Sequence, residues 1–195
     1  MSWLLPPFDD AGLCHAFQPA WGRGAIPSLV LAEAISPAAA RRLRGLARAH
    51  LEAYSLADRG RFRFATAPGM PALGEVAAEL SSFAAAATGL SLGAGAAALT
   101  RLGHGDYALR WDDWRRRLQG PLLEATLDLS PAPCPGADTV YSEGPGVHFS
   151  LSQAPGQLGL VLRGPAGSRF DRYLSCYAGR RAVWKLRAAF PISEG

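Results

Sequence analysis

The sequence predicts an α+β protein with a helical N-terminal part followed by an all-β C-terminal part. Apolar residues between 37 and 54 recur at helical spacing, with arginines on the opposite face. From residue 90 onward, short runs rich in Val, Leu, Thr, Tyr and Phe alternate with Gly and Pro turns. Many short strands at regular spacing are typical of a β-sandwich or barrel.

Two amphipathic helices are expected in the N-terminal part, after a short strand over 26–35. Ser36 followed by Pro37 is typical of a helix start, so the first helix is predicted over 37–54. Its apolar positions are Leu43, Leu46, Ala47, Leu51 and Tyr54, and its arginines form a solvated face. A second helix carries Val76, Leu80, Phe83 and Ala87 and is predicted to end at Gly89.

The remaining chain predicts strands separated by turns. Arg61–Phe64 alternate in polarity, and 68–71 read as a turn. The later strands are expected at 95–102, 105–111, 122–129, 138–142, 147–152, 157–163, 169–177 and 181–189.

A chain of 195 residues suits one compact domain, and we expect an N-terminal arm over 1–25 and a single domain over 26–195. Its longest apolar stretches fall far short of the roughly 20 residues that cross a bilayer. The N-terminus lacks the basic start of a signal peptide, so the expected location is cytoplasmic.

Composition and motifs exclude several function classes. The net charge is +4, and Lys185 is the only lysine among 20 basic residues. No nucleic-acid-binding motif accompanies this charge, so we expect no nucleic-acid partner. The three widely spaced cysteines form no CxxC pair, which argues against a zinc site and a disulfide framework. There is no Gly-x-Ser-x-Gly nucleophile motif or phosphate-binding loop.

One segment and the strands after it resemble a known family. Residues 101–114, RLGHGDYALRWDDW, resemble the segment of the 2-oxoglutarate/iron(II) oxygenases, in the prolyl-hydroxylase-like branch, that leads into a His-x-Asp pair. Further resemblance lies in 122–129, 135–141, 156–163, 169–174 and 181–184, in the family's order and spacing. Together these segments and the helices before them extend the resemblance over about residues 26–190.

The resemblance implies a double-stranded β-helix, or jelly roll, with N-terminal helices packed on one sheet. It also implies a metal triad of two histidines and one carboxylate that holds iron(II) and leaves positions for 2-oxoglutarate and oxygen. A basic residue on a late strand would pair with the far carboxylate of 2-oxoglutarate.

The residues at the expected metal positions do not match that triad. Alignment on the Gly-Asp-Tyr phrase places Trp111 at the first histidine and Asp113 at the carboxylate; a shift by one residue gives Arg110 and Asp112. The second histidine position falls on Phe170 or Arg169. An indole N–H only donates and a phenyl ring has no lone pair for a metal, so the triad is degenerate. The two aspartates can instead form a turn or helix cap that faces Arg115–Arg117.

The expected function is therefore that of a non-catalytic, oxygenase-like protein that acts by binding and needs no cofactor. Arg181 is the candidate anchor for a small carboxylate, with Arg180 as its neighbour on the other strand face. Tyr107 is a candidate hydrogen-bond donor in the same 2-oxoglutarate pocket. The partner would be a small carboxylate or a protein or peptide, and the sequence carries no signal for an oligomeric state.

Two alternatives stay open. An active 2-oxoglutarate-dependent hydroxylase would need a relocated iron(II) site built from His148, Asp113 and either His104 or Asp112. This requires the polar face of 147–152 to line the pocket. The other alternative is an unrelated jelly-roll binding module, which helices packed on the main sheet ahead of the core strands would disfavour.

Overall fold

The computed structural model describes residues 2–50, 52–55, 62–67, 70–108, 120–152, 154–172, 174 and 181–193. Its short helices α1 (Ala11–Cys14) and η1 (His15–Ala20) precede the longer α2 (Pro37–Arg48) and α3 (Pro71–Thr88). The strands are β1 (Ser28–Leu31), β2 (Glu52–Ser55), β3 (Phe62–Ala67), β4 (Ala96–Leu102), β5 (Tyr107–Ala108), β6 (Leu122–Asp128), β7 (Thr139–Ser142), β8 (His148–Leu151), β9 (Leu158–Arg163), β10 (Ser168–Asp171) and β11 (Val183–Pro191).

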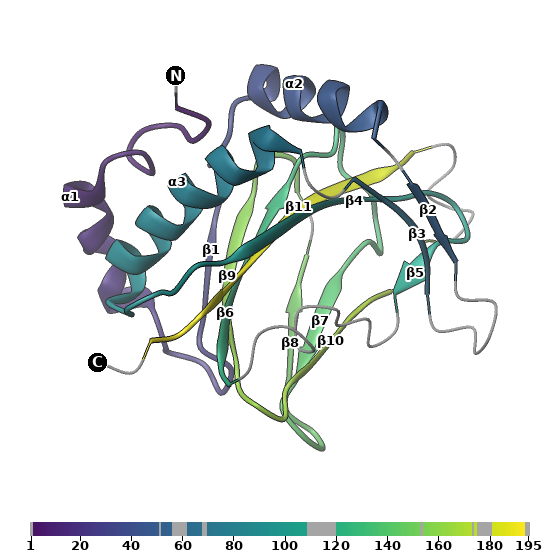
Figure 1. Cartoon of the computed structure of the whole chain (residues 1–195). Helices are drawn as coiled ribbons and strands as arrows, with labels where there is room; N and C mark the ends of the chain where they lie inside the picture. Colours follow the sequence, from purple (N-terminus) through teal and green to yellow (C-terminus); the bar gives the residue numbers. More distant parts are fainter. Residues whose placement is uncertain are drawn as a thin grey trace.

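The strands form a jelly roll of antiparallel strands, as the resemblance implied (Figure 1). One sheet runs β1-β9-β6-β11-β4-β3, with β2 paired to β3, and we call it the major sheet. The other, the minor sheet, runs β5-β10-β7-β8 and joins the first through the β3–β5 pair. After β4, the strands β6, β9 and β11 lie in the major sheet and β5, β7, β8 and β10 in the minor sheet, so the chain passes repeatedly from one sheet to the other.

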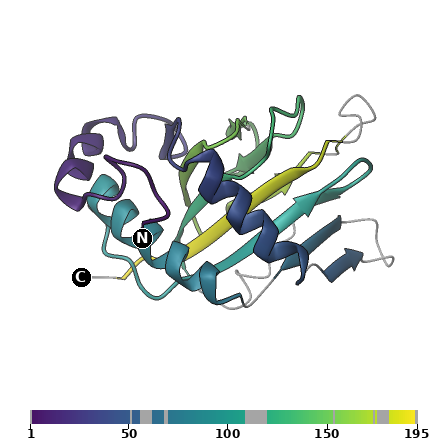
Figure 2. The ribbon, with the colours of Figure 1, turned by 90° about the horizontal axis from the view of Figure 1, so that it is seen from above.

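Helices α2 and α3 cover the outer face of the major sheet (Figure 2). Leu43 of α2 and Val76, Leu80 and Phe83 of α3 share one buried cluster with residues of that sheet. Alternation along the strands directs Leu123, Leu127, Leu160, Leu186 and Phe190 into this cluster, so the main apolar core lies outside the jelly roll, under the helices.

The N-terminal residues belong to the same core. Trp3, Leu4 and Phe8 are buried in it, and Leu4 forms an isolated bridge with Ile35. The Phe8 ring meets Phe83 of α3 edge-on, with centroids 5.7 Å apart. The proposed boundary between an arm and a domain at residue 25 stays a prediction.

The start of α2 is as expected, but its end is not. The Ser36 hydroxyl accepts a hydrogen bond from the Ala39 amide at 3.1 Å, and Pro37 opens the helix. The helix ends at Arg48 rather than at residue 54, because residues 52–55 pair with β3 as the strand β2. Leu46, placed on the apolar face by its spacing, is 43% exposed.

The second helix starts earlier than its apolar positions indicate. It begins at Pro71, which the sequence pattern assigned to a turn, since proline is well suited to the first helical position. It ends as predicted, with Gly89 in the left-handed conformation (φ 73°).

Gly159 of β9 marks a close approach between the two sheets. A Cβ atom at this position would lie 2.5 Å from Leu151 Cδ2 of β8. We expect Gly159→Ala to lower the free energy of unfolding by about 1–3 kcal/mol, as other overpacking substitutions do. Urea unfolding would measure this, with Gly74→Ala as the matched control.

Gly74 lies on the exposed face of α3, where a Cβ atom would meet nothing within 4 Å. Alanine there should raise stability by about 0.5–1 kcal/mol. A neutral Gly159→Ala, or equal effects of the two substitutions, would contradict the described packing between the sheets.

Candidate functional site

The inner faces of the two sheets carry charged side chains where an apolar filling is usual. Six buried residues linked by ion pairs form what we call the interior ion cluster: Glu124, Arg163, Arg169, Asp171, Lys185 and Arg187. They lie on β6, β9, β10 and β11, each at a position whose neighbours along the strand face the other way. Asp128, at the end of β6, is also buried, and its carboxylate accepts from the Ser130 amide at 2.7 Å. The space between the sheets therefore holds an ionic cluster beside smaller apolar clusters, such as that of Tyr141, Leu151 and Val161.

Glu124 on β6 binds two arginines from different sheets. Its carboxylate forms an ion pair with Arg163 on the neighbouring strand β9 and accepts from Arg169 Nη1, on the minor sheet, at 2.8 Å. The Arg163 and Glu124 side chains are each 1% exposed and Arg169 is 6% exposed. One carboxylate thus ties the major sheet to the minor sheet.

Asp171 on β10 is the counterpart of Glu124 further along the interior. It pairs with Lys185 Nζ of β11 at 2.8 Å and with Arg187, and Thr139 Oγ1 donates to it at 2.8 Å. Lys185 also donates to the Ala137 carbonyl at 3.0 Å and to Thr139 Oγ1 at 2.8 Å. These three bonds use all three donors of the ammonium group.

The cluster changes the pKa values of its members. Burial alone would raise the pKa of Asp171, but the charges of Arg187 and Lys185 outweigh it and hold that pKa well below its ordinary value. Burial lowers the pKa of Lys185, partly offset by Asp171. Asp171 is therefore ionised at neutral pH and acts as the counter-ion of two cations.

Tyr141 of β7 lies beside the cluster, and its pKa gives a prediction at alkaline pH. Burial, with a contribution from the Glu124 charge, raises that pKa to about 12. The folded state keeps the phenol proton longer than the unfolded state, so its stabilisation is complete below pH ~10 and is lost as pH rises toward 12.

We expect the ultraviolet titration of the folded protein to show one tyrosine that ionises late, and Tyr141→Phe to remove it. Tyr54→Phe serves as the matched control because Tyr54 lies on β2, away from the inner-face residues of β7. A late phase that survives Tyr141→Phe would contradict the assignment.

Several residues singled out from the sequence lie outside the described part of the chain. These are Trp111 and Asp113, together with Arg110, Asp112 and Arg180. Their roles at the metal position stay predictions.

The structure places the two candidates for the second histidine position, Arg169 and Phe170, on opposite faces of β10. Arg169 is buried and bound to Glu124, whereas Phe170 is half-buried and lies on the other face. On β10 the interior positions are held by a guanidinium group and a carboxylate.

Arg181, Tyr107 and His148 do not lie among the interior residues. Arg181 is exposed and donates to the Pro133 carbonyl at 3.2 Å. Tyr107 is half-buried and lies on the face of β5 opposite to that of the buried Ala108. His148 is exposed on β8, while Phe149 packs against the buried cluster of Tyr141 and Leu151.

The polar face of β8 is therefore its outer face, which removes the premise on which His148 was placed in a relocated metal site. His104 is exposed in the turn before β5. Among the described residues, no three His, Cys, Asp or Glu side chains lie close enough to hold a metal ion.

The interior basic residues of the last strand were missed by sequence reasoning. Lys185 and Arg187 alternate with Trp184, Leu186 and Ala188 in an otherwise apolar run. The same signal, a charge inside an apolar strand, is present at Glu124 in LLEATLD. Charged residues at alternating positions of several predicted strands indicate a paired ionic interior, and this pattern is visible in the sequence.

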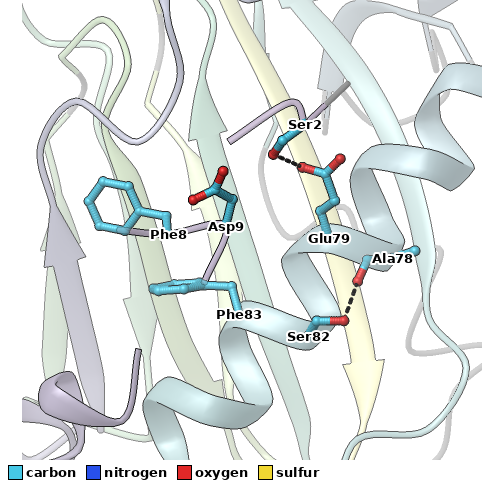
Figure 3. A pocket seen from close by; sticks show the side chains of 7 residues that line it. All are labelled: Ser2, Phe8, Asp9, Ala78, Glu79, Ser82 and Phe83. Atoms are coloured by element: carbon cyan, nitrogen blue, oxygen red, sulfur yellow. Dashed lines mark hydrogen bonds between the residues drawn. The ribbon is translucent and has the colours of Figure 1, made fainter. Parts of the chain in front are cut away.

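A separate hollow lies between α3 and the N-terminal segment (Figure 3). Its polar groups serve the fold: the Glu79 carboxylate accepts from Ser2 Oγ at 3.0 Å and from the backbone amides of Trp3 and Leu4. Ser82 donates to the Ala78 carbonyl at 3.1 Å. Glu79 thus anchors the chain end to α3.

Several solved structures similar to this chain are prolyl hydroxylases or a 2OG-Fe(II) oxygenase. A prolyl-4-hydroxylase from Pseudomonas putida matches with a TM-score of 0.64 and 15% identity, over 93% of this chain and 98% of that one. A member of the 2OG-Fe(II) oxygenase family from Burkholderia pseudomallei gives 0.64 and 12%, over 93% and 90%. A prolyl hydroxylase from Trichoplax adhaerens, in complex with a peptide fragment of hypoxia inducible factor, gives 0.63 and 12%, over 92% and 88%.

The chain therefore has the fold of the 2-oxoglutarate/iron(II) oxygenases. Within that class its architecture is the prolyl-hydroxylase-like one, as the residues around Gly105 had suggested. No protein-family model matches the sequence, and no curated protein sequence matches it. In the described part of the chain, no helix is long and apolar enough to cross a membrane.

The described residues do not suit the iron(II) of that fold class. Glu124 and Asp171 are each engaged with two cationic side chains, and a divalent cation would enter among four positive charges. Asp171 Oδ2 is buried without a hydrogen-bond partner among the described residues, but it supplies one ligand where a triad needs three. The space lined by Asp171, Lys185 and Leu102 has no room for a water-sized sphere.

Proposed function

We propose that this protein is a non-catalytic relative of the oxygenases that acts by binding. The observation that carries the proposal is the pairing of Glu124 with Arg163 and Arg169 between the sheets. Arg169 stands at one of the two positions expected for the second histidine, and a guanidinium group has no lone pair for a metal.

The ion pairs of Asp171 argue in the same way against the binding of 2-oxoglutarate, the co-substrate of the oxygenases. The basic residues that face the interior from the last strand are Lys185 and Arg187, and both are bound to Asp171. A carboxylate of 2-oxoglutarate would have to displace Asp171 from them. Removing one partner of a buried pair commonly costs about 3–5 kcal/mol, which makes this exchange unfavourable.

An active hydroxylase with a relocated metal site is the second candidate. It has less support, because His148 lies on the outer face of β8. The unrelated jelly-roll module is also disfavoured, because α2 and α3 cover the major sheet and precede the core strands, as in the oxygenase architecture (Figure 2). A cytoplasmic location and the absence of a nucleic-acid partner remain parts of the proposal.

Anaerobic calorimetric titration with iron(II) or manganese(II), with and without 2-oxoglutarate, tests the proposal. We expect no binding of either metal at micromolar concentration and no tightening by 2-oxoglutarate. Micromolar binding that 2-oxoglutarate strengthens would overturn the non-catalytic function.

His148→Gln then separates the alternatives, because His148 is exposed and its loss should leave the fold intact. Metal binding that this variant abolishes would establish the relocated site. Metal binding that it preserves would place the ligands elsewhere in the chain. Either result contradicts the proposal.

A further inference from the structure

A pocket of about 450 Å³ lies outside the jelly roll, at the beginning of α2. We call it the α2-start pocket. The β1–α2 connection, the first two turns of α2 and the segments that follow β6 and precede β9 line it, including Glu33, Ile35, Arg41, Arg44, Ser130 and Pro131. Its volume falls within the range of roughly 300–1,000 Å³ that is usual for small-molecule sites.

The walls of the α2-start pocket are held by backbone hydrogen bonds. The Ala34 amide donates to the Gly156 carbonyl at 2.7 Å, and the Gly156 amide donates to the Asp128 carbonyl at 2.9 Å. A Cβ atom at Gly156 would lie 3.2 Å from the Ile35 carbonyl oxygen, so the two segments pack backbone to backbone. Glu33 has a left-handed backbone (φ 55°), which is uncommon for a residue other than glycine. The pocket is thus formed before any ligand arrives.

Apolar side chains and two arginines face this space. The apolar lining includes Leu5, Ile35 and Pro131, and the charged lining consists of Arg41, Arg44 and a single carboxylate, Glu33. Arg41 is exposed and Arg44 is half-buried. Arg44 donates from Nη1 to the Leu129 carbonyl, which orients a group that carries five N–H donors.

The surroundings of Arg44 favour an incoming anion. Burial, followed by the charges of Arg41 and Arg48, lowers the pKa of Arg44, while Asp128 acts in the opposite direction. A ligand carboxylate placed between Arg41 and Arg44 would compensate these like charges and complete the hydrogen bonding of the guanidinium groups.

We propose that the α2-start pocket binds a small molecule that combines a carboxylate with an apolar body. The carboxylate contacts Arg41 and Arg44, and the apolar body packs against Ile35, Leu5 and Pro131. This deepens the proposed binding function by locating it outside the barrel interior. The ligand class follows from the lining of the pocket and does not depend on whether a metal binds between the sheets.

Titration with three probes, followed by backbone amide NMR signals, tests the site. Phenylacetate carries both features, phenylacetamide lacks the charge, and acetate lacks the apolar body. We expect saturable shifts at Ser130 and Gly156 with phenylacetate and at least about tenfold weaker binding of the other two. Phenylacetamide loses a charge-assisted hydrogen bond, and acetate loses the burial of the apolar body.

Matched variants assign the effect to residues. Arg41→Gln should weaken phenylacetate binding about tenfold. Arg48→Gln, on the same helix but outside the pocket lining, should change it less than about twofold, as expected for an exposed charge that does not contact the ligand. Glu33→Gln should tighten binding by removing the one carboxylate of the lining.

Three results would overturn the inference: no saturable shift at the pocket amides, equal binding of phenylacetate and phenylacetamide, or equal effects of Arg41→Gln and Arg48→Gln. Arg41 and Arg48 are both exposed, so the variants should fold, and their amide spectra verify this. A failed phenylacetate titration would not change the result of the metal titration, and metal binding between the sheets would not exclude a ligand in the α2-start pocket. The two proposals can therefore fail separately.

Discussion

Glu124→Gln is expected to lower the free energy of unfolding by about 3–5 kcal/mol, the usual range for breaking a buried ion pair. Glutamine has nearly the same shape but no charge, so the substitution removes the carboxylate that Arg163 and Arg169 share. Both guanidinium groups would stay buried without that counter-ion. Urea unfolding at pH 7 measures the effect.

Asp138→Asn is the matched surface control. Asp138 pairs with Arg172 at 3.3 Å, and the Arg172 side chain is 55% exposed. Its loss should cost only about 0–1 kcal/mol. Similar costs for the two variants would show that the Glu124 pairs are not buried as described.

A triple replacement of Glu124, Arg163 and Arg169 by Leu, Met and Leu keeps the test decisive if Glu124→Gln fails to fold. Replacing a buried ionic group by apolar residues of similar volume is often neutral or stabilising by about 1–4 kcal/mol. We expect the triple variant to regain most of the stability that the single variant loses. A triple variant as unstable as Glu124→Gln would contradict the electrostatic origin of the loss.

Asp171→Asn is expected to show a second large effect, and one that depends on pH. At pH 7 it removes the counter-ion of Lys185 and Arg187, so a loss of about 3–5 kcal/mol is expected. Since the folded-state pKa of Asp171 is lowered, its stabilisation is complete above the unfolded-state pKa, near 4, and is lost as pH falls through that value toward the folded one.

The stability gap between the native protein and Asp171→Asn should therefore narrow on acidification. Between pH 6 and pH 3 we expect it to shrink by about 1 kcal/mol. Asp9→Asn is the control: Asp9 is exposed, and its replacement should change the free energy of unfolding at pH 7 by no more than about 0.5 kcal/mol. A gap for Asp171→Asn that is constant or widens toward pH 3 would contradict the assigned direction of the pKa shift.

The strands could be predicted from the sequence because their signals are local. Alternation and Gly or Pro turns located β4 and β6–β9 within a few residues. The end of α2 could not be predicted. Residues 52–55 continue the helical pattern in the sequence, but they form a strand because they pair with β3, a separate segment of the chain. Propensity over a short window carries no information about such a partner.

The interior ion cluster was missed for a related reason. The spacing argument fixed a position for a basic anchor at Arg181, whereas the register of β11 turns Lys185 and Arg187 inward. Likewise, spacing alone gave either Phe170 or Arg169 as the position of the second histidine. Only the register of β10 with β7 shows which of the two side chains faces the interior. A shift of one residue reverses the face of every side chain on a strand.

Crystals of the protein soaked in manganese(II) and 2-oxoglutarate, measured at a wavelength where manganese scatters anomalously, give the most direct test of an interior filled by its own ion pairs. We predict no anomalous peak between the major and minor sheets, with Arg169 still bound to Glu124 and Asp171 still bound to Lys185 and Arg187. A manganese peak between the sheets, with 2-oxoglutarate beside it and Arg169 turned away from Glu124, would contradict the account.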